Sequence, residues 1–287
     1  MRILVSGSEG MLASDLIPLL RQHHHCYGAS RAELDITDVA GVFKAVEGYR
    51  PDVLINCAAF TNVDLAQSQQ REAMLVNGIG VQNLALACAQ YDVPLCQIST
   101  DYVFDGSKTT PYTPFDTPRP INYYGESKLA GEWYVKWLCR RFYIVRTSWL
   151  YGEHGNNFVK TILRLGQERS ELRVVDDQVG SPTWTVTLAL AIKMIIESGR
   201  YGIYHVTNET DGRLTWYGFA CEILRRAGCS TRVVPITTAE YPRPAARPPY
   251  SVLDMTTTVL SVGLEPVKWN KALTWYLKRG GFLRCYE

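Results

Sequence analysis

The sequence has no long hydrophobic run and no excess of either charge. No apolar stretch approaches the roughly 20 residues that a membrane-spanning helix needs, so we expect no membrane segment. The formal net charge is +2 and the Lys and Arg residues are dispersed, which argues against a partner such as nucleic acid or an anionic membrane. Residues 1–5 read as a strand with no signal peptide ahead of them, and we therefore expect a cytoplasmic protein.

Closely spaced cysteine pairs are also absent. The chain contains eight cysteines but no Cys-x-x-Cys pair, and Cys57, Cys88 and Cys96 lie inside apolar runs. This arrangement predicts reduced, mostly buried thiols and no disulfide framework. Three consecutive histidines at 23–25 could bind a metal ion adventitiously, but a polar loop is the simpler interpretation.

What the first half does contain is a regular alternation of strand-like and helix-like segments. Each strand is followed by a helical pattern, the longest at 71–90 and 123–139. Five such repeats indicate an α/β protein of the Rossmann type, with a doubly wound parallel sheet and right-handed crossovers. Strands are predicted at residues 2–6, 26–29, 51–59, 94–100 and 142–146.

After residue 150 the segments become shorter and less regular. A helix is predicted to open at 156–160 with Asn156 as its cap, and a terminal helix near 272–278. Between them we expect strands at 172–175, 202–206 and 233–236 and helices at 185–197 and 215–226. We expect residues 1–150 to form an NAD(P)-binding domain and residues 151–287 to form a smaller C-terminal substrate-binding lobe, interleaved with the far edge of the sheet.

A glycine-containing turn follows the first strand. Gly7 and Gly10 are followed by Met11, Leu12 and Ala13, with alanine where a third glycine would help the helix to pack. Glycines allow the backbone to approach a pyrophosphate, and the helix N-terminus supplies unpaired N–H groups. The alternative is a plain tight turn.

Residues after the second and third predicted strands are candidates to bind the parts of a dinucleotide other than its pyrophosphate. Ser30 and Arg31 follow the second strand, where an acidic residue would indicate NADH, and they suit a 2′-phosphate. We therefore expect NADPH, with NADH possible; a solvated loop position for Arg31 is the alternative. Ala58 and Ala59 at the third strand end would let a flat cofactor lie against the backbone.

The third feature combines a hydroxyl with a Tyr-x-x-x-Lys pair. Thr100 ends the fourth strand, and Tyr124 and Lys128 lie four residues apart on the next predicted helix, so they share one face. An ammonium beside a phenol favours the phenolate, which would lower the pKa of Tyr124 and make it a general acid. A chance spacing on a solvated helix is the alternative. The proline-rich segment 101–120 between them is predicted to be a functional loop over the site.

These motifs together resemble the extended short-chain dehydrogenase/reductases, and within them the reductases that complete dTDP-L-rhamnose synthesis. The resemblance covers essentially the whole chain, and the motifs of the second half are the specific ones. The segments that carry it are 99–104, 124–128, 146–151, 155–161, 177–183 and 246–248.

The resemblance implies NAD(P)H-dependent reduction of the 4-keto group of dTDP-4-dehydro-L-rhamnose, a dTDP-linked 4-keto-6-deoxyhexose. It implies Tyr124 as proton donor, Lys128 on the cofactor ribose, Thr100 beside the reacting oxygen and Trp149 against the sugar ring. Together with the residues read from the pattern, the expected cofactor-binding set is Gly7, Gly10, Met11, Leu12, Ser30, Arg31, Asp35, Ile36, Ala58, Ala59, Phe60, Thr61, Tyr124 and Lys128. The expected substrate-binding set is Thr100, Asp101, Tyr124, Trp149, Asn157 and Arg247.

Several alternatives stay open at the level of sequence. Another nucleotide-linked ketosugar could be the substrate, and Tyr250 stands where relatives often carry Asn, which puts one substrate contact in doubt. A non-catalytic regulatory subunit on the same fold is the rival from another class. Some family members bind Mg²⁺ through carboxylates at a dimer interface, but no carboxylate cluster here justifies a metal site, and a homodimer is neither required nor excluded.

Overall fold

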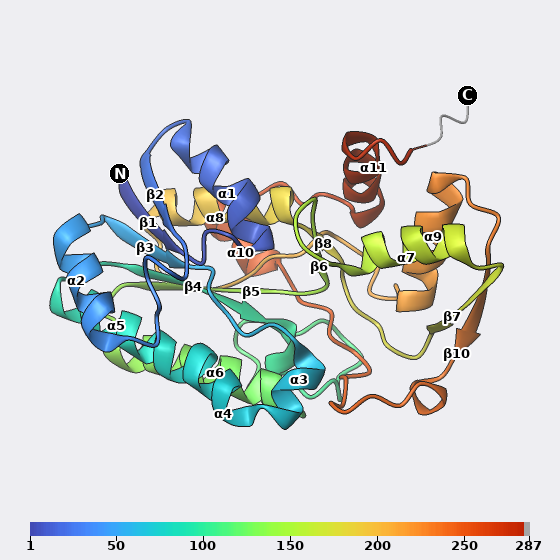
Figure 1. Cartoon of the computed structure of the whole chain (residues 1–287), viewed down its shortest axis with the longest axis horizontal. Helices are drawn as coiled ribbons and strands as arrows, with labels where there is room; N and C mark the ends of the chain where they lie inside the picture. Colours follow the sequence, from blue (N-terminus) through green and yellow to red (C-terminus); the bar gives the residue numbers. More distant parts are fainter. Residues whose placement is uncertain (284–287) are drawn as a thin grey trace.

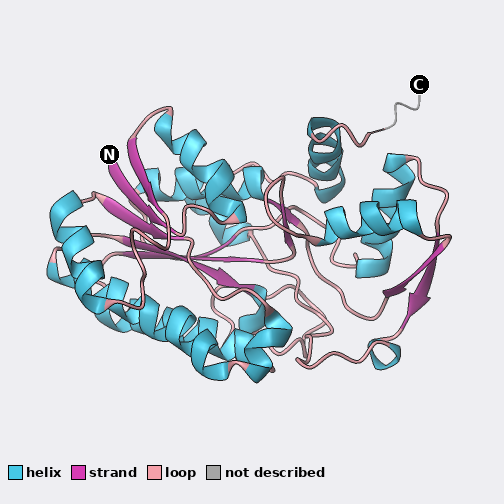
Figure 2. Cartoon of the chain, viewed as in Figure 1, coloured by secondary structure: helices cyan, strands magenta, loops and turns pink. Residues whose placement is uncertain are grey.

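The computed structural model describes residues 1–283, and its centre is a parallel sheet (Figures 1 and 2). All strand pairs in this sheet are parallel, in the order β2-β1-β3-β4-β5-β9. The predicted doubly wound Rossmann-type sheet is thereby confirmed. The strands are β1 Arg2–Ser6, β2 His25–Ala29, β3 Val53–Asn56, β4 Leu95–Thr100, β5 Phe142–Thr147 and β9 Gly202–His205.

Helices cover both faces of the sheet, as the apolar character of its strands requires. On one face α1 (Met11–Arg21) and α8 (Thr185–Ser198) close one hydrophobic cluster with the strands. On the other face α2 (Val39–Tyr49), α5 (Val81–Gln90) and α6 (Tyr123–Leu138) close a second. The chain therefore places α8 and β9, from its second half, against strands from its first half (Figure 1).

Most of the remaining second-half elements form a lobe beside the sheet, with its own hydrophobic cluster (Figure 1). Helices α7 (Phe158–Glu168), α9 (Trp216–Ala227) and α11 (Trp269–Arg279) pack with the parallel pair β7 (Glu171–Val175) and β10 (Arg232–Ile236). A second short pair joins β6 (Leu150–Tyr151) to β8 (Thr183–Trp184). The last four residues of the predicted lobe lie outside the described residues.

Four expectations about local structure were wrong. The third strand ends at Asn56, not at residue 59, because the Asn56 side chain accepts a hydrogen bond from the backbone N–H of Ala58 (3.1 Å) and turns the chain out of the sheet. Two short helices, α3 (Val63–Ser68) and α10 (Thr256–Val262), were not predicted. The cap of α7 is Asn157, whose side chain accepts from Lys160 N, and not Asn156. The fourth concerns the helix expected at 71–90.

That helix is interrupted. It consists of α4 (Gln70–Met74), a π-helical turn at Leu75–Gly80, and α5. Asn77 in the π-helical turn is buried and bonds both backbone groups of Phe60, accepting from N (2.9 Å) and donating to O (3.0 Å). The same amide donates to Ser127 Oγ on α6 (3.0 Å). π-helical turns occur frequently at functional sites, and this one holds the loop after β3 against α6.

The other sequence expectations concern single side chains and membrane segments. Within residues 1–283, no helix is long and apolar enough to cross a bilayer. The cysteines among these residues are unpaired thiols; Cys285 lies outside them. His24 hydrogen-bonds Glu197 (2.7 Å) in the turn before β2, which begins at His25.

Candidate active site

A cavity of 680 Å³ opens at the carboxyl ends of the central strands. The sheet order reverses around β1, because β2 lies on one side of it and β3 on the other. Ligands of doubly wound sheets bind in the crevice at such a switch point. The lining comes from the turns after β1, β3, β4 and β5, from the start of α6 and from the small lobe, which contributes Trp216.

The turn between β1 and α1 is shaped to lie close to a ligand. Gly7 has φ +70°, and a Cβ there would lie 2.6 Å from the backbone nitrogen of Ala58, so glycine is required. Gly10 is the N-cap of α1 and provides no side-chain cap, so the first N–H groups of the helix are left for another acceptor. Both glycines line the cavity. This turn fits a dinucleotide pyrophosphate.

A hydrogen-bonded row of buried side chains ties the strand ends together beneath the cavity. Ser6 Oγ donates to Asn56 Oδ1 (2.7 Å), and Asn56 Nδ2 donates to Gln97 Oε1 (2.8 Å). Gln97 in turn donates to the carbonyl oxygen of Ile98 (2.8 Å). Because the row crosses β1, β3 and β4, it fixes the relative positions of the three strand ends.

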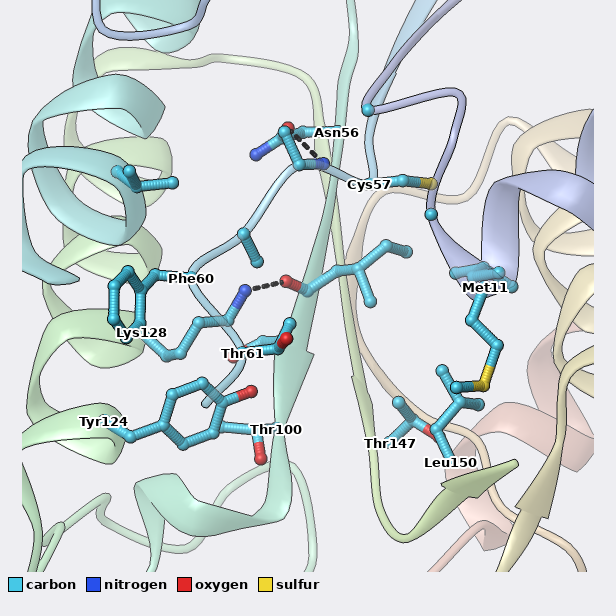
Figure 3. A pocket seen from close by; sticks show the side chains of 18 of the residues that line it. Met11, Asn56, Cys57, Phe60, Thr61, Thr100, Tyr124, Lys128, Thr147 and Leu150 are labelled. Atoms are coloured by element: carbon cyan, nitrogen blue, oxygen red, sulfur yellow. Dashed lines mark hydrogen bonds between the residues drawn. The ribbon is translucent and has the colours of Figure 1, made fainter. Parts of the chain in front are cut away.

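The carbonyl oxygen of Ile98 also accepts a hydrogen bond from the ammonium of Lys128. Lys128 Nζ donates to Ile98 O at 2.7 Å, on the same side of the cavity as Tyr124, with Met11 opposite (Figure 3). The side chain is buried, and burial lowers its pKa to about 8, while the carboxylate of Glu132 opposes that shift. Lys128 is therefore a buried cation facing the space between the glycine turn and α6.

Tyr124 and Thr100 come together at the other end of this wall (Figure 3). The two hydroxyls lie close together, and Thr100 Oγ1 donates to Asp101 Oδ1 (3.0 Å). Burial raises the pKa of Asp101 to about 7, against hydrogen bonds from Ser251 and Thr100 that lower it. A phenol, a hydroxyl and a carboxyl thus converge at the cavity wall.

The expectation that Lys128 lowers the pKa of Tyr124 was wrong for this structure. Burial raises the pKa of Tyr124 above its ordinary value, the negative charge of Asp101 adds to the rise, and only the neighbouring Thr100 hydroxyl opposes it. The physical reason is the burial of the phenol, and the Lys128 ammonium donates its hydrogen bond to the Ile98 carbonyl and not to the phenolic oxygen. The phenol therefore stays protonated at neutral pH, which is the form a proton donor needs.

The start of α6 is held tightly, which orients Tyr124. Asn122 caps the helix, with Oδ1 accepting from Gly125 N (2.8 Å). A Cβ at Gly125 would overlap the carbonyl oxygen of Tyr102, so glycine allows the helix to approach this close. The Tyr102 ring meets the Tyr124 ring edge-on, with centroids 6.0 Å apart and planes at 80°.

A buried ion pair supports the end of β4 from below. Arg146 donates to Glu132 through Nε (2.8 Å) and Nη2 (2.6 Å), and Ser99 Oγ donates to the same carboxylate (2.6 Å). His205 lies beside Arg146 (3.4 Å), and burial with this neighbouring positive charge lowers the pKa of His205 to about 3. The neutral imidazole leaves the charge of Arg146 balanced by Glu132.

Arg31 and Asp35 line the far end of the cavity, after β2. Arg31 is 80% exposed and contacts Asp35 at 3.4 Å, so its guanidinium is accessible to a ligand. Hydrogen bonds from Thr37 lower the pKa of Asp35. Ser30 does not line the cavity; its N–H and hydroxyl both bond Glu33.

An aromatic wall forms where the β5–β6 turn meets α9 of the small lobe. Trp149 stacks on Trp216 with ring centroids 3.5 Å apart and planes at 12°. Trp149 has φ +45°, an uncommon conformation for a residue with a side chain, and both rings line the cavity. Asn156 lines it too, whereas Asn157 caps α7 and donates to Gly152 O (2.8 Å).

Most of the predicted site residues are thus brought together. Ser30, Asn157 and Arg247 do not line the cavity, and their ligand contacts stay predictions. Arg247 instead pairs with Asp64 and hydrogen-bonds the carbonyl oxygen of Ala245. The predicted residues that line the cavity are Gly7, Gly10, Met11, Leu12, Arg31, Asp35, Ile36, Ala58, Ala59, Phe60, Thr61, Thr100, Asp101, Tyr124, Lys128 and Trp149.

Sequence reasoning missed several lining residues, including Glu9, Asn56, Cys57, Ser148 and Trp216. Those at strand ends could have been found, since every side chain just after a parallel strand is a candidate at such a switch point. Trp216 carries no such signal, because only the packing of α9 against the β5–β6 turn brings it to the cavity.

The glycine turn, the strand-end hydroxyl and the Tyr-x-x-x-Lys pair around one cavity define a dinucleotide-dependent oxidoreductase of the short-chain dehydrogenase/reductase class. More specifically, the chain belongs to the RmlD substrate binding domain family, whose family model matches residues 1–281.

Individual relatives agree with this family. A dTDP-4-dehydrorhamnose reductase of Streptomyces griseus is 45% identical over 282 residues, covering 95% of this chain and 92% of that protein. A dTDP-4-keto-6-deoxy-D-glucose reductase of Streptomyces niveus is 42% identical over 277 residues, covering 95% of each. The crystal structure of the Bacillus anthracis dTDP-4-dehydrorhamnose reductase in complex with NADP superimposes with a TM-score of 0.93 at 41% identity, covering 96% of this chain and 98% of that one.

Proposed function

We propose that this protein reduces the 4-keto group of dTDP-4-dehydro-L-rhamnose to give dTDP-L-rhamnose, with NADPH as hydride donor. The observation that carries the proposal is the convergence of Thr100, Tyr124 and Lys128 on one wall of a cavity whose far side is the Gly7–Gly10 turn. With Tyr124 as the proton donor and this turn as the cofactor cradle, the donor would face the cofactor across the cavity. The identities and names of the relatives support the dTDP-linked ketosugar as substrate.

The residues would divide the work as follows. The turn at Gly7 and Gly10 would bind the pyrophosphate, and the exposed guanidinium of Arg31 would bind a 2′-phosphate. The bound nicotinamide supplies the hydride. Lys128 would hold the adjoining ribose through its ammonium, which the Ile98 carbonyl already orients.

Proton delivery would come from Tyr124. Its raised pKa keeps the proton on the phenolic oxygen until the developing alkoxide, a much stronger base, accepts it. Thr100 would bond the same substrate oxygen and thereby fix its distance from the phenol. Removal of one such proton donor typically costs about 10²- to 10⁴-fold in rate.

A second candidate is direct reduction of dTDP-4-keto-6-deoxy-D-glucose, the sugar named for the Streptomyces niveus relative. The two substrates share the nucleotide and the 4-keto group and differ in sugar configuration. The wall at Trp149 and Trp216 would distinguish them, since its two stacked rings line the cavity with apolar surface against which a sugar ring can pack.

One reconstitution separates these functions. The purified protein is incubated with NADPH, dTDP-glucose and the dehydratase that makes the 4-keto-6-deoxy sugar, with or without the epimerase that follows. Oxidation of NADPH only with the epimerase, together with dTDP-rhamnose, supports the main proposal, and oxidation without it supports the second candidate. No oxidation in either arm would favour another ketosugar or a regulatory role without turnover.

We further propose a cytoplasmic enzyme that has no nucleic-acid or membrane partner. The balanced charge of the chain supports this. A homodimer is the alternative to a monomer, and light scattering of the purified protein distinguishes them.

A further inference from the structure

Residues 243–249, called the arm below, run from the small lobe to the cofactor-binding side of the molecule. The arm ends in Pro248 and Pro249, which pack against Gly106, where any Cβ would overlap them. Its middle reaches the starts of two helices, α3 and α6, through Asp64 and Asn122. The arm therefore joins the lobe to the elements that carry the cofactor loop and Tyr124.

Asp64 is the main attachment point of the arm. Its Oδ2 accepts from Arg243 Nε (2.9 Å), and its Oδ1 accepts from Ala245 N (3.3 Å) and from Arg247 Nη1. The carboxylate is only 16% exposed, and Arg247 is 15% exposed against 44% for Arg243. Asp64 lies in the first turn of α3, three residues after Thr61 of the cavity lining.

Arg247 connects Asp64 with the side of the cavity that carries Tyr124. Its guanidinium lies near enough to the buried Tyr102 phenol to oppose the rise in that phenol's pKa, and the Tyr102 ring lies edge-on to Tyr124. A guanidinium has five N–H donors in a rigid fork, and Nη1 is engaged by Asp64 and by the carbonyl oxygen of Ala245. The remaining donors can bind a diphosphate, which Arg recognises well.

Asn122 provides a second attachment one residue away. Its Nδ2 donates to the carbonyl oxygen of Ala246 (2.8 Å), and its Oδ1 caps α6 at Gly125. The same side chain thus positions both the arm and the helix of Tyr124. Asn122 thus holds Ala246 and Asp64 holds Arg247, and these two contacts on consecutive residues restrict the position of Arg247.

We propose that Asp64 is a positioning residue for the sugar nucleotide. It does so by holding Arg247, which does not itself line the cavity, beside Tyr102, which does, so that the guanidinium would reach the anionic part of the substrate. Asp64 itself does not line the cavity, so it acts through Arg247 and the backbone at Ala245. The inference rests on the proposed function, because it assumes a nucleotide diphosphate as the ligand of Arg247.

The test compares Asp64→Asn, Asp64→Glu and the control Arg243→Ala, which removes the exposed partner of the same carboxylate. For Asp64→Asn we expect the KM for the dTDP-ketosugar to rise about tenfold, the effect of losing one charge-assisted hydrogen bond. kcat and the NADPH dissociation constant should keep their wild-type values. Asp64→Glu should recover part of the KM, and Arg243→Ala should stay within about twofold of wild type.

Three results would overturn the inference. One is an unchanged KM in Asp64→Asn; another is a fall in kcat as large as the rise in KM. The third is a parallel loss of NADPH binding, which would make Asp64 a general structural anchor. If the wild-type enzyme turns over neither dTDP-ketosugar, the proposed function fails, and calorimetric binding of dTDP to the same variants still decides the role of Asp64.

Discussion

Lys128 Nζ lies 2.7 Å from the carbonyl oxygen of Ile98, so the ammonium is anchored on β4, while its helix neighbour Tyr124 lies beside Thr100 (Figure 3). The two members of the Tyr-x-x-x-Lys pair thus have separate partners on the same strand. This separation supports the proposed division of roles, in which the cation binds the cofactor and the phenol acts on the substrate.

The first prediction concerns the pH dependence of cofactor binding. Because burial lowers the pKa of Lys128 to about 8, its ammonium is charged below that pH and loses its proton above it. NADPH affinity should therefore fall as the pH rises through about 8. Fluorescence titration of NADPH on both sides of this value measures the effect. Lys128→Arg should bind NADPH with a flat profile, since guanidinium keeps its charge; a variant profile that still falls would assign the transition to another group.

The second prediction separates the phenol from cofactor binding. Tyr124→Phe should lower kcat by about 10²- to 10⁴-fold, because it removes the proton donor and leaves the ring in place. The NADPH dissociation constant should be unchanged within about twofold. Tyr123→Phe, the adjacent phenol that does not line the cavity, is the matched control and should retain wild-type turnover. Equal rates for the two variants would remove Tyr124 from the chemistry.

The third prediction concerns the choice of cofactor. Arg31→Ala should raise the KM for NADPH about tenfold, the value of one charge-assisted hydrogen bond to a phosphate. The KM for NADH should change little, because NADH has no 2′-phosphate. Steady-state kinetics with both cofactors measure the ratio directly. Equal increases for the two would place the guanidinium away from the ribose.

The fourth prediction concerns stability. Glu132→Leu leaves Arg146 buried without its carboxylate partner and should lower the free energy of unfolding by about 3–5 kcal/mol. Glu132→Leu combined with Arg146→Met removes both charges and should recover most of that loss. Urea unfolding followed by circular dichroism gives the values. If the double variant is no more stable than the single one, Glu132 is needed for its hydrogen bond with Ser99 and not for balancing the charge of Arg146.

Local sequence patterns predicted the elements of the first half well. The strand before Gly7 and the helix of Tyr124 begin and end near the expected residues, since apolar periodicity and capping residues act over short distances. The helix at 71–90 was misjudged, because its π-helical turn arises from the bonds of Asn77 to Phe60 and Ser127, which are distant in sequence.

What the sequence by itself determined is the type of chemistry: a glycine turn after a strand, a strand-end Thr100, and Tyr124 and Lys128 on one helix face. Only the tertiary structure decided how these groups are tuned. Burial raised the pKa of Tyr124, because the free-energy cost of removing a charge from water depends on every element that surrounds the group. Folding also brought the Lys128 ammonium within hydrogen-bonding distance of the Ile98 carbonyl. Folding alone also brought Trp216 to Trp149 and Asp64 to Arg247, since contacts between residues this far apart have no local signature.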